Sequence, residues 1–106
     1  MIDLKKIQKQ VRVWNDKNFP EKCFWHQFVG VVEEVGELAH SLLKQAQGIR
    51  GTHDEHEEAA KDAVGDIIIF LVNLCNIRGW DLEKIIKDTW NQVSKRDWTN
   101  KNANGA

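Results

Sequence analysis

The sequence of 106 residues contains one proline, no tyrosine and only two cysteines. Cys23 and Cys75 are too few for a disulfide framework, so we expect both to be free thiols. No apolar run approaches the ~20 residues of a membrane-spanning helix, and the first residues lack the apolar core of a secretory signal. The formal net charge of -1 argues against a general binder of nucleic acid. We therefore expect a cytoplasmic protein that has no membrane or nucleic-acid partner.

The remaining composition, 42% hydrophobic and 29% charged, is typical of a soluble globular protein. A chain of this length fits one domain, but its high surface-to-volume ratio leaves the stability marginal, and oligomerisation would raise it. The last residues are rich in Asn, Gly and Ala. We expect a single all-α domain over residues 1–98 and a flexible C-terminal tail over residues 99–106.

Apolar residues recur at helical spacing along the chain, and nowhere do they alternate as in a strand. The sequence predicts helices over 3–18, from 20 or a few residues later to 47, over 52–77, and from 81 onward. Asp3 and Asp81 are good N-caps, Thr52 or Asp54 caps the third helix, and Gly48 ends the second. Short loops between these helices favour an all-α fold that resembles a four-helix bundle.

The second predicted helix contains two glycines, Gly30 and Gly36, in its interior. Each glycine weakens a helix by ~1 kcal/mol relative to alanine, so each one needs an explanation. Two explanations remain open: close approach by another backbone or a ligand, or tight packing between helices.

Acidic residues cluster on the second and third predicted helices, in Glu33-Glu34-Val35-Gly36-Glu37 and in Asp62-Ala63-Val64-Gly65-Asp66. Residues three or four apart share a helix face, so Glu34 and Glu37 point together, with Glu33 beside them. Asp62 and Asp66 likewise share a stripe with Asn73. The third helix is otherwise apolar on nearly all sides, which predicts a helix surrounded by protein, with Asp66 and Asn73 facing the second helix.

Ionised carboxylates beside apolar sequence are costly unless a cation or hydrogen bonds hold their charge. Several of them at one place suggest a site for Mg²⁺ or Mn²⁺, since these ions prefer oxygen ligands. Such a site suits hydrolysis of phosphoanhydrides, because bound ions neutralise a polyphosphate and activate water. The alternative is that the acids are solvated and paired with Lys44, Arg50 or Lys61.

The layout of Glu33-Glu34-x-x-Glu37, followed by Gly65-Asp66 at the head of an apolar helix, resembles the MazG-like nucleoside triphosphate pyrophosphohydrolases. These all-α enzymes are related to dimeric dUTPases. The resemblance implies Mg²⁺-dependent cleavage of a ribo- or deoxyribonucleoside triphosphate to the monophosphate and pyrophosphate, in control of the nucleotide pool. It also implies that Glu34, Glu37 and Asp66 bind the metal and that Glu33 is a further ligand or a base that orients water.

One position departs from the Glu-x-x-Asp motif of that family, because its glutamate would fall at Ala63. We expect Asp62, one helical turn before Asp66, to replace it. Since the MazG-like proteins assemble as dimers or dimers of dimers, the resemblance further implies a homodimer or homotetramer with pockets near the subunit contacts.

Further residues are candidates for binding the substrate. Lys44, Lys95 and Arg96 offer cations for the β- and γ-phosphates. Trp25 and Trp98 offer indole rings for base stacking, whereas Trp14 is expected in the core. The complete set of substrate-binding candidates is Trp25, His26, Lys44, Asn73, Lys95, Arg96 and Trp98.

Three other functions are weighed against the hydrolase. Glu37-x-x-His40 is one element of a di-iron site, but the second copy that such a site needs is missing. Cys23-x-x-His26 and His53-x-x-His56 together offer four ligands for structural zinc, an uncommon set for that ion. The acidic stripe also suits a non-enzymatic helical module that docks on a basic partner.

Overall fold

The computed structural model describes residues 1–99, which form four helices and no strand. The helices are α1 (Leu4–Asn18), α2 (Phe24–Gln47), α3 (His53–Arg78) and α4 (Leu82–Val93). The predicted all-α fold class is therefore confirmed. The flexible tail expected over residues 99–106 lies outside the described residues except for Thr99.

The helix ends follow the capping signals in the sequence. The Asp3 and Asp81 side chains each accept a hydrogen bond from a backbone N–H of the first turn. Thr52, rather than Asp54, caps α3 and does so within a capping box. Gly48 and Gly79 end α2 and α3 with φ of 69° and 70°, in the left-handed region that favours glycine. The helix boundaries are therefore set locally.

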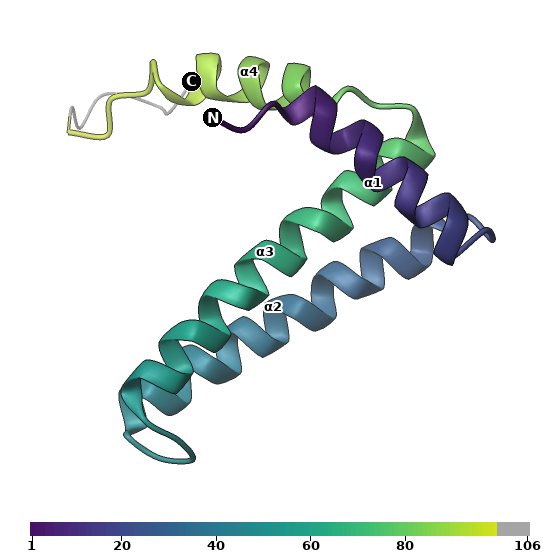
Figure 1. The fold of residues 1–106 in the computed structure, drawn as a ribbon. Coiled ribbons are helices and arrows are strands. Elements are labelled where there is room, and N and C mark those ends of the chain that lie inside the picture. Colours follow the sequence, from purple (N-terminus) through teal and green to yellow (C-terminus); the bar gives the residue numbers. More distant parts are fainter. Residues whose placement is uncertain (100–106) are drawn as a thin grey trace.

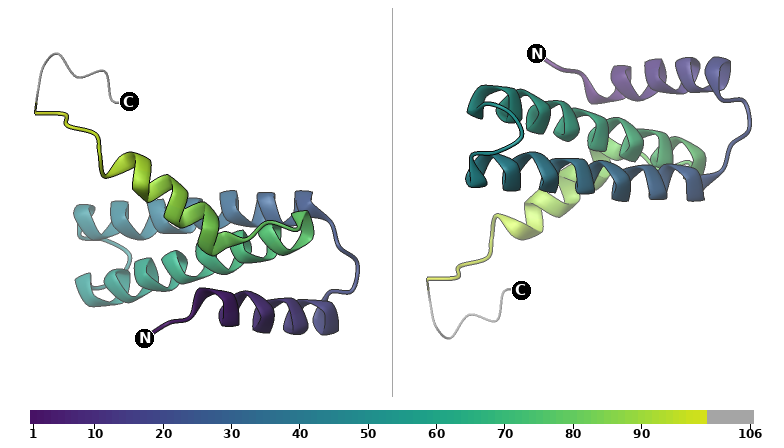
Figure 2. Two further views of the ribbon diagram at one scale, coloured as in Figure 1. Left: turned by 90° about the horizontal axis from the view of Figure 1, so that it is seen from above. Right: turned by 90° about the horizontal axis from the view of Figure 1, so that it is seen from below.

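The longest element is an antiparallel hairpin of α2 and α3 (Figure 1). Helix α1 lies against α3, and α4 packs chiefly against α1 (Figure 2). The radius of gyration is 17.3 Å, whereas a compact domain of this length has a value of about 13 Å. The four helices are therefore arranged more openly than in a closed bundle.

The buried apolar core within residues 1–99 is small and consists mainly of Ala60, Ala63, Val72 and Cys75. The prediction that protein surrounds the third helix is wrong for the single chain: Ile68, for example, is 47% exposed. Helix α2 covers one face of α3 and α1 covers another, but a third apolar face has no cover from the described residues. An apolar pattern predicts burial without saying which element provides it.

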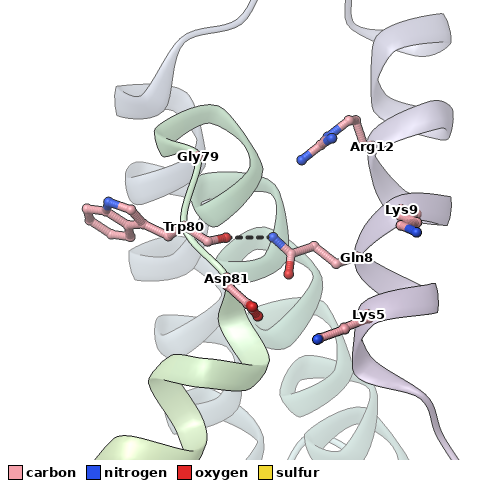
Figure 3. A pocket seen from close by; sticks show the side chains of 7 residues that line it. All are labelled: Lys5, Gln8, Lys9, Arg12, Gly79, Trp80 and Asp81. Atoms are coloured by element: carbon pink, nitrogen blue, oxygen red, sulfur yellow. Dashed lines mark hydrogen bonds between the residues drawn. The ribbon is translucent and has the colours of Figure 1, made fainter.

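Polar side chains hold α1 in place. The Gln8 side chain donates to the Trp80 carbonyl at 2.8 Å (Figure 3). It also accepts from the Leu82 N–H at 3.2 Å. Asn76 donates to the Gln8 carbonyl at 3.1 Å. The buried residues of α1 are Gln8 and Asn15. Trp14 is 53% exposed, so its predicted place in the core is wrong.

Gly30 on α2 packs against the Phe70 ring of α3. A Cβ added to Gly30 would overlap that ring and force it to move, so glycine allows this packing without strain. For Gly30, tight helix packing is thus the correct explanation. Apart from the backbone of its own helix and its chain neighbours, nothing in residues 1–99 lies within 4 Å of a Cβ added at Gly36, so packing within the single chain does not explain this glycine, and close approach by a ligand stays a prediction.

Two smaller expectations can also be compared with the structure. Cys23 and Cys75 are both free thiols, as predicted, and burial raises the pKa of Cys75. In the part of the chain that the structure describes, no helix combines the length and the apolar character needed to cross a membrane.

Candidate active site

The contact between Gly30 and Phe70 sets the register of the α2–α3 hairpin. Because the two helices are antiparallel, positions equally far from this contact lie roughly opposite each other. Glu34 and Asp66 are each four residues from the contact on one side. Gln27 and Asn73 are each three residues from it on the other side. The face between α2 and α3 therefore carries an acidic pair and an amide pair, separated by Gly30 and the Phe70 ring.

Negative charge concentrates on Glu34. Burial raises the pKa of this carboxyl, and the charge of Asp66 on the facing helix raises it further. Three more carboxylates act on it in the same direction, those of Glu33, Glu37 and Asp62. Glu34 and Asp66 are half-buried, whereas the other three are exposed. All five acids selected from the sequence are thus close enough to interact electrostatically.

The carboxylates are not drawn together into a tight ligand set. Within residues 1–99, no group of three or more His, Cys, Asp or Glu side chains is close enough to hold a metal ion. Like charges on facing helices repel each other, and a cation placed between them would remove that repulsion. Because the donors are all carboxylate oxygens, the set fits a hard ion such as Mg²⁺.

Ala63 occupies the position at which the family motif has a glutamate. It is 3% exposed and lies opposite Glu37, where it offers no ligand. Asp62, the expected replacement, is exposed, and its charge raises the pKa of Glu34 less than those of Asp66, Glu33 and Glu37 do.

The predicted phosphate-binding cations do not gather at the acids in the single chain. The Lys44 ammonium donates to the Gln47 side chain at 2.9 Å. Lys95, Arg96 and Trp98 follow α4, which extends away from the α2–α3 hairpin (Figure 1). A role for these residues in substrate binding stays a prediction.

The start of α2 forms a concave site. His26 lines a cavity of about 520 Å³ together with Phe19, Pro20 and Gln27. The Trp25 side chain stacks on Phe28, with ring centroids 6.1 Å apart, and is 59% exposed. Of the two predicted base-recognition residues here, His26 therefore faces a cavity, while Trp25 lies on the surface.

The two zinc-competent pairs lie at opposite ends of the hairpin. Cys23 and His26 are at the start of α2, and His53 and His56 are at the start of α3. With 24 residues in α2, these ends are about 36 Å apart. The His56 ring is used elsewhere, in a 2.9 Å hydrogen bond to the Ile49 carbonyl. One chain therefore cannot assemble the zinc site considered above.

Some residues of the α2–α3 face were not among the predicted site residues. Gln27 and Phe70 belong to it, although only Gln27 carried a signal, since it lies seven residues before Glu34 on the same polar stripe. Phe70 looks like an ordinary core residue in the sequence. Its role as the spacer between the acidic pair and the amide pair depends on the contact with Gly30.

These features define a class: an all-α protein in which two antiparallel helices carry carboxylates at facing positions and neutral amides further along. The model of the MazG nucleotide pyrophosphohydrolase domain family matches residues 28–99, and the chain belongs to that family. The match includes both acidic clusters and confirms the resemblance seen in the sequence. Comparisons with curated proteins and with solved structures found no match. Membership supports a nucleotide pyrophosphohydrolase activity, and therefore a hydrolase.

Proposed function

We propose that the protein hydrolyses ribo- or deoxyribonucleoside triphosphates to the monophosphate and pyrophosphate, with Mg²⁺ as cofactor and Mn²⁺ as a substitute. The observation that carries this proposal is the interaction of four other carboxylates, from both helices, with the half-buried Glu34. This charge lies inside the region that the family model matches. Such a concentration of negative charge fits divalent cations, which a polyphosphate substrate also requires.

Glu34, Glu37 and Asp66 would hold the ions, and Asp62 would replace the glutamate that is absent at Ala63. Bound divalent ions neutralise the phosphates and lower the pKa of water. Glu33 orients the attacking water and accepts its proton. The water oxygen bonds to the α-phosphorus while the bond to the bridging oxygen breaks, and pyrophosphate leaves with that electron pair.

Cations and aromatic rings complete the proposed substrate site. Lys44, Lys95 and Arg96 bind the β- and γ-phosphates, since ammonium and guanidinium groups pair well with phosphate oxygens. Trp25, Trp98 and His26 contact the base. The role in the cell is control of the nucleotide pool.

The uncovered apolar face supports a homo-oligomer. Val29, Val32 and Val35 on α2 are between 49% and 61% exposed, and Val64 and Ile68 on α3 are 49% and 47% exposed. Apolar surface of this extent is typical of an interface. We propose a homodimer or a dimer of dimers, in which α4 of one subunit brings Lys95 and Arg96 toward the acids of another.

The proposed reaction is tested by a pyrophosphate-release screen. Ribo-, deoxyribo- and modified nucleoside triphosphates are incubated with Mg²⁺, with Mn²⁺ or with a chelator. We expect release only with a divalent ion, and a loss of at least roughly 100-fold in kcat for Glu34→Gln and for Asp66→Asn. Glu58→Gln serves as the matched control, because Glu58 is exposed and pairs with Lys61. A folded protein that releases no pyrophosphate from any nucleotide would instead support the helical interaction module.

A further inference from the structure

Two amide side chains of the hairpin, the half-buried Gln27 on α2 and the buried Asn73 on α3, each have a buried oxygen without a hydrogen-bond partner among the described residues. Among residues 1–99, Gln27 Oε1 and Asn73 Oδ1 are the buried side-chain polar atoms that no donor of the chain reaches. Asn73 as a whole is only 4% exposed. A buried carbonyl without a partner is destabilising, so such groups normally have an external partner or a function.

The two amides lie at matching positions of the antiparallel helices. Gln27 on α2 and Asn73 on α3 are equally far from the contact between Gly30 and Phe70, and therefore lie roughly opposite each other. Each is seven residues from an acid on its own helix, Gln27 from Glu34 and Asn73 from Asp66. Seven helical residues rise by about 10 Å. The two amides thus lie about two helical turns from the acidic pair. Both are toward the end of the hairpin where α2 begins and α3 ends.

Polar neighbours of Asn73 are already engaged with other groups. Asn73 lines a small cavity of about 20 Å³ between α3 and α1, together with Arg12 and Asp16. Arg12 donates to the Asn76 side chain, and Asp16 pairs with Lys22 at 2.9 Å. Beside Gln27 lies the much larger cavity of about 520 Å³ that His26 also lines. The cavity beside Asn73 has room for a single small polar group, and the cavity beside Gln27 has room for a ring.

We propose that Gln27 and Asn73 form the nucleoside subsite of the proposed hydrolase and hydrogen-bond donor groups of the base or sugar. This inference rests on the proposed function, since it takes the acids as the phosphate end. A nucleotide has a charged end and a neutral, hydrogen-bonding end, and the hairpin offers carboxylates for ions at one place and neutral amides at the other. The separation of about 10 Å suits a molecule whose phosphates and base lie on opposite sides of its sugar.

The variants that test the subsite are Gln27→Met and Asn73→Leu, which keep the side-chain size but remove the amide. Gln10→Met and Asn91→Leu make the same changes at exposed positions and serve as matched controls. Kinetics are measured on the best nucleoside triphosphate, with inorganic tripolyphosphate as a competitor that has no nucleoside. Thermal unfolding of each variant is measured in parallel.

We expect each site variant to raise KM roughly tenfold, with kcat and the inhibition constant of tripolyphosphate unchanged. The unfolding temperature should stay the same or rise, because a buried acceptor without a partner has been removed. An unchanged KM would overturn the subsite, and so would a parallel rise in the tripolyphosphate constant. A lower unfolding temperature with unchanged KM would show that the amides only bind structural water.

Nucleotides that lack sugar hydroxyls, together with a series of bases, identify the donor. A variant effect that disappears with 2′,3′-dideoxynucleotides assigns the amides to the sugar, and one that changes with the base assigns them to base recognition.

A wild-type protein without turnover refutes the proposed function, but it does not remove this test. Calorimetry with an α,β-methylene nucleoside triphosphate and Mg²⁺ then compares binding directly. Weaker binding by the two site variants supports the subsite, whereas equal binding, or no binding by the wild type, overturns it.

Discussion

The environment of Glu34 favours its protonated form, whereas the proposed function needs the ionised carboxylate as a metal ligand. Burial and the charges of Asp66, Glu33, Glu37 and Asp62 raise its pKa above the ordinary value of 4.5. A carboxyl group whose folded pKa is raised stabilises the fold below its unfolded pKa, and this contribution is lost as the pH rises through the folded pKa. The ionised site is therefore a source of instability that a bound cation would relieve.

The Glu34→Gln variant tests this opposition. Without Mg²⁺, we expect the variant to unfold at a higher temperature than the wild type at neutral pH, because the repelled charge is gone. The unfolding temperature of the wild type should fall as the pH rises through the Glu34 pKa, and the variant should show less of this fall. Thermal scans across pH check both effects. Adding Mg²⁺ should stabilise the wild type more than the variant, and equal stabilisation would contradict the assignment of Glu34 as a ligand.

Replacing Gly30 or Gly36 by alanine should have opposite effects on the stability of the fold, although both glycines lie inside α2. Gly30→Ala should destabilise the fold by ~1–3 kcal/mol, because its Cβ overlaps the Phe70 ring. Gly36→Ala should stabilise it by up to ~1 kcal/mol, since nothing of the described chain lies within 4 Å of the added atom. Urea unfolding measures both changes. Equal effects at the two positions would show that the α2–α3 contact is not where the structure has it.

At the scale of elements, the attachment of α1 depends on Gln8. Its side chain and backbone take part in three hydrogen bonds, to Trp80, Leu82 and Asn76. Gln8→Ala leaves the partly buried Trp80 carbonyl and Leu82 N–H without their side-chain partner, so we expect a loss of about 1–2 kcal/mol. Amide hydrogen exchange should increase in α1 and at the start of α4, with less change in α2. Gln10→Ala, on the exposed side of α1, should change neither quantity.

The limits of the helices were predictable because they depend on neighbours in sequence. Asp3, Thr52 and Asp81 cap helices with their own side chains, and Gly48 and Gly79 supply the left-handed residue at the ends. A grouping of the acids on two helix faces also followed from spacing alone, and the charges acting on Glu34 agree with it.

The packing between helices was not predictable in the same way. The register of α2 on α3 depends on the contact between Gly30 and Phe70. Nothing in the sequence indicates that these two residues contact each other. Asn15 is buried on α1 at 6% exposure, whereas the apolar Trp14 beside it is not buried. Polar contacts such as that of Gln8 decide which face of α1 meets α3, and hydrophobic periodicity does not report them.

The whole molecule is open and exposes a large part of its apolar surface. Its radius of gyration of 17.3 Å and the exposed valines of α2 are both explained if a second copy covers the hairpin. Light scattering after size exclusion should therefore give the mass of a dimer or tetramer. Val32→Glu and Ile68→Lys, placed on the exposed faces of α2 and α3, should lower that mass, and Gln10→Glu should not. A wild-type monomer at micromolar concentration would contradict the proposed assembly.

In the function proposed above, carboxylates of α2 and α3 hold divalent ions at the phosphate end of a nucleotide. The most direct measurement is a crystal structure grown with Mn²⁺ and an α,β-methylene nucleoside triphosphate, in which anomalous scattering locates the metal. We expect Mn²⁺ between Glu34 and Asp66, in contact with phosphate oxygens. Nucleotide bound elsewhere, with Glu34 and Asp66 facing solvent and no anomalous peak between them, would contradict it.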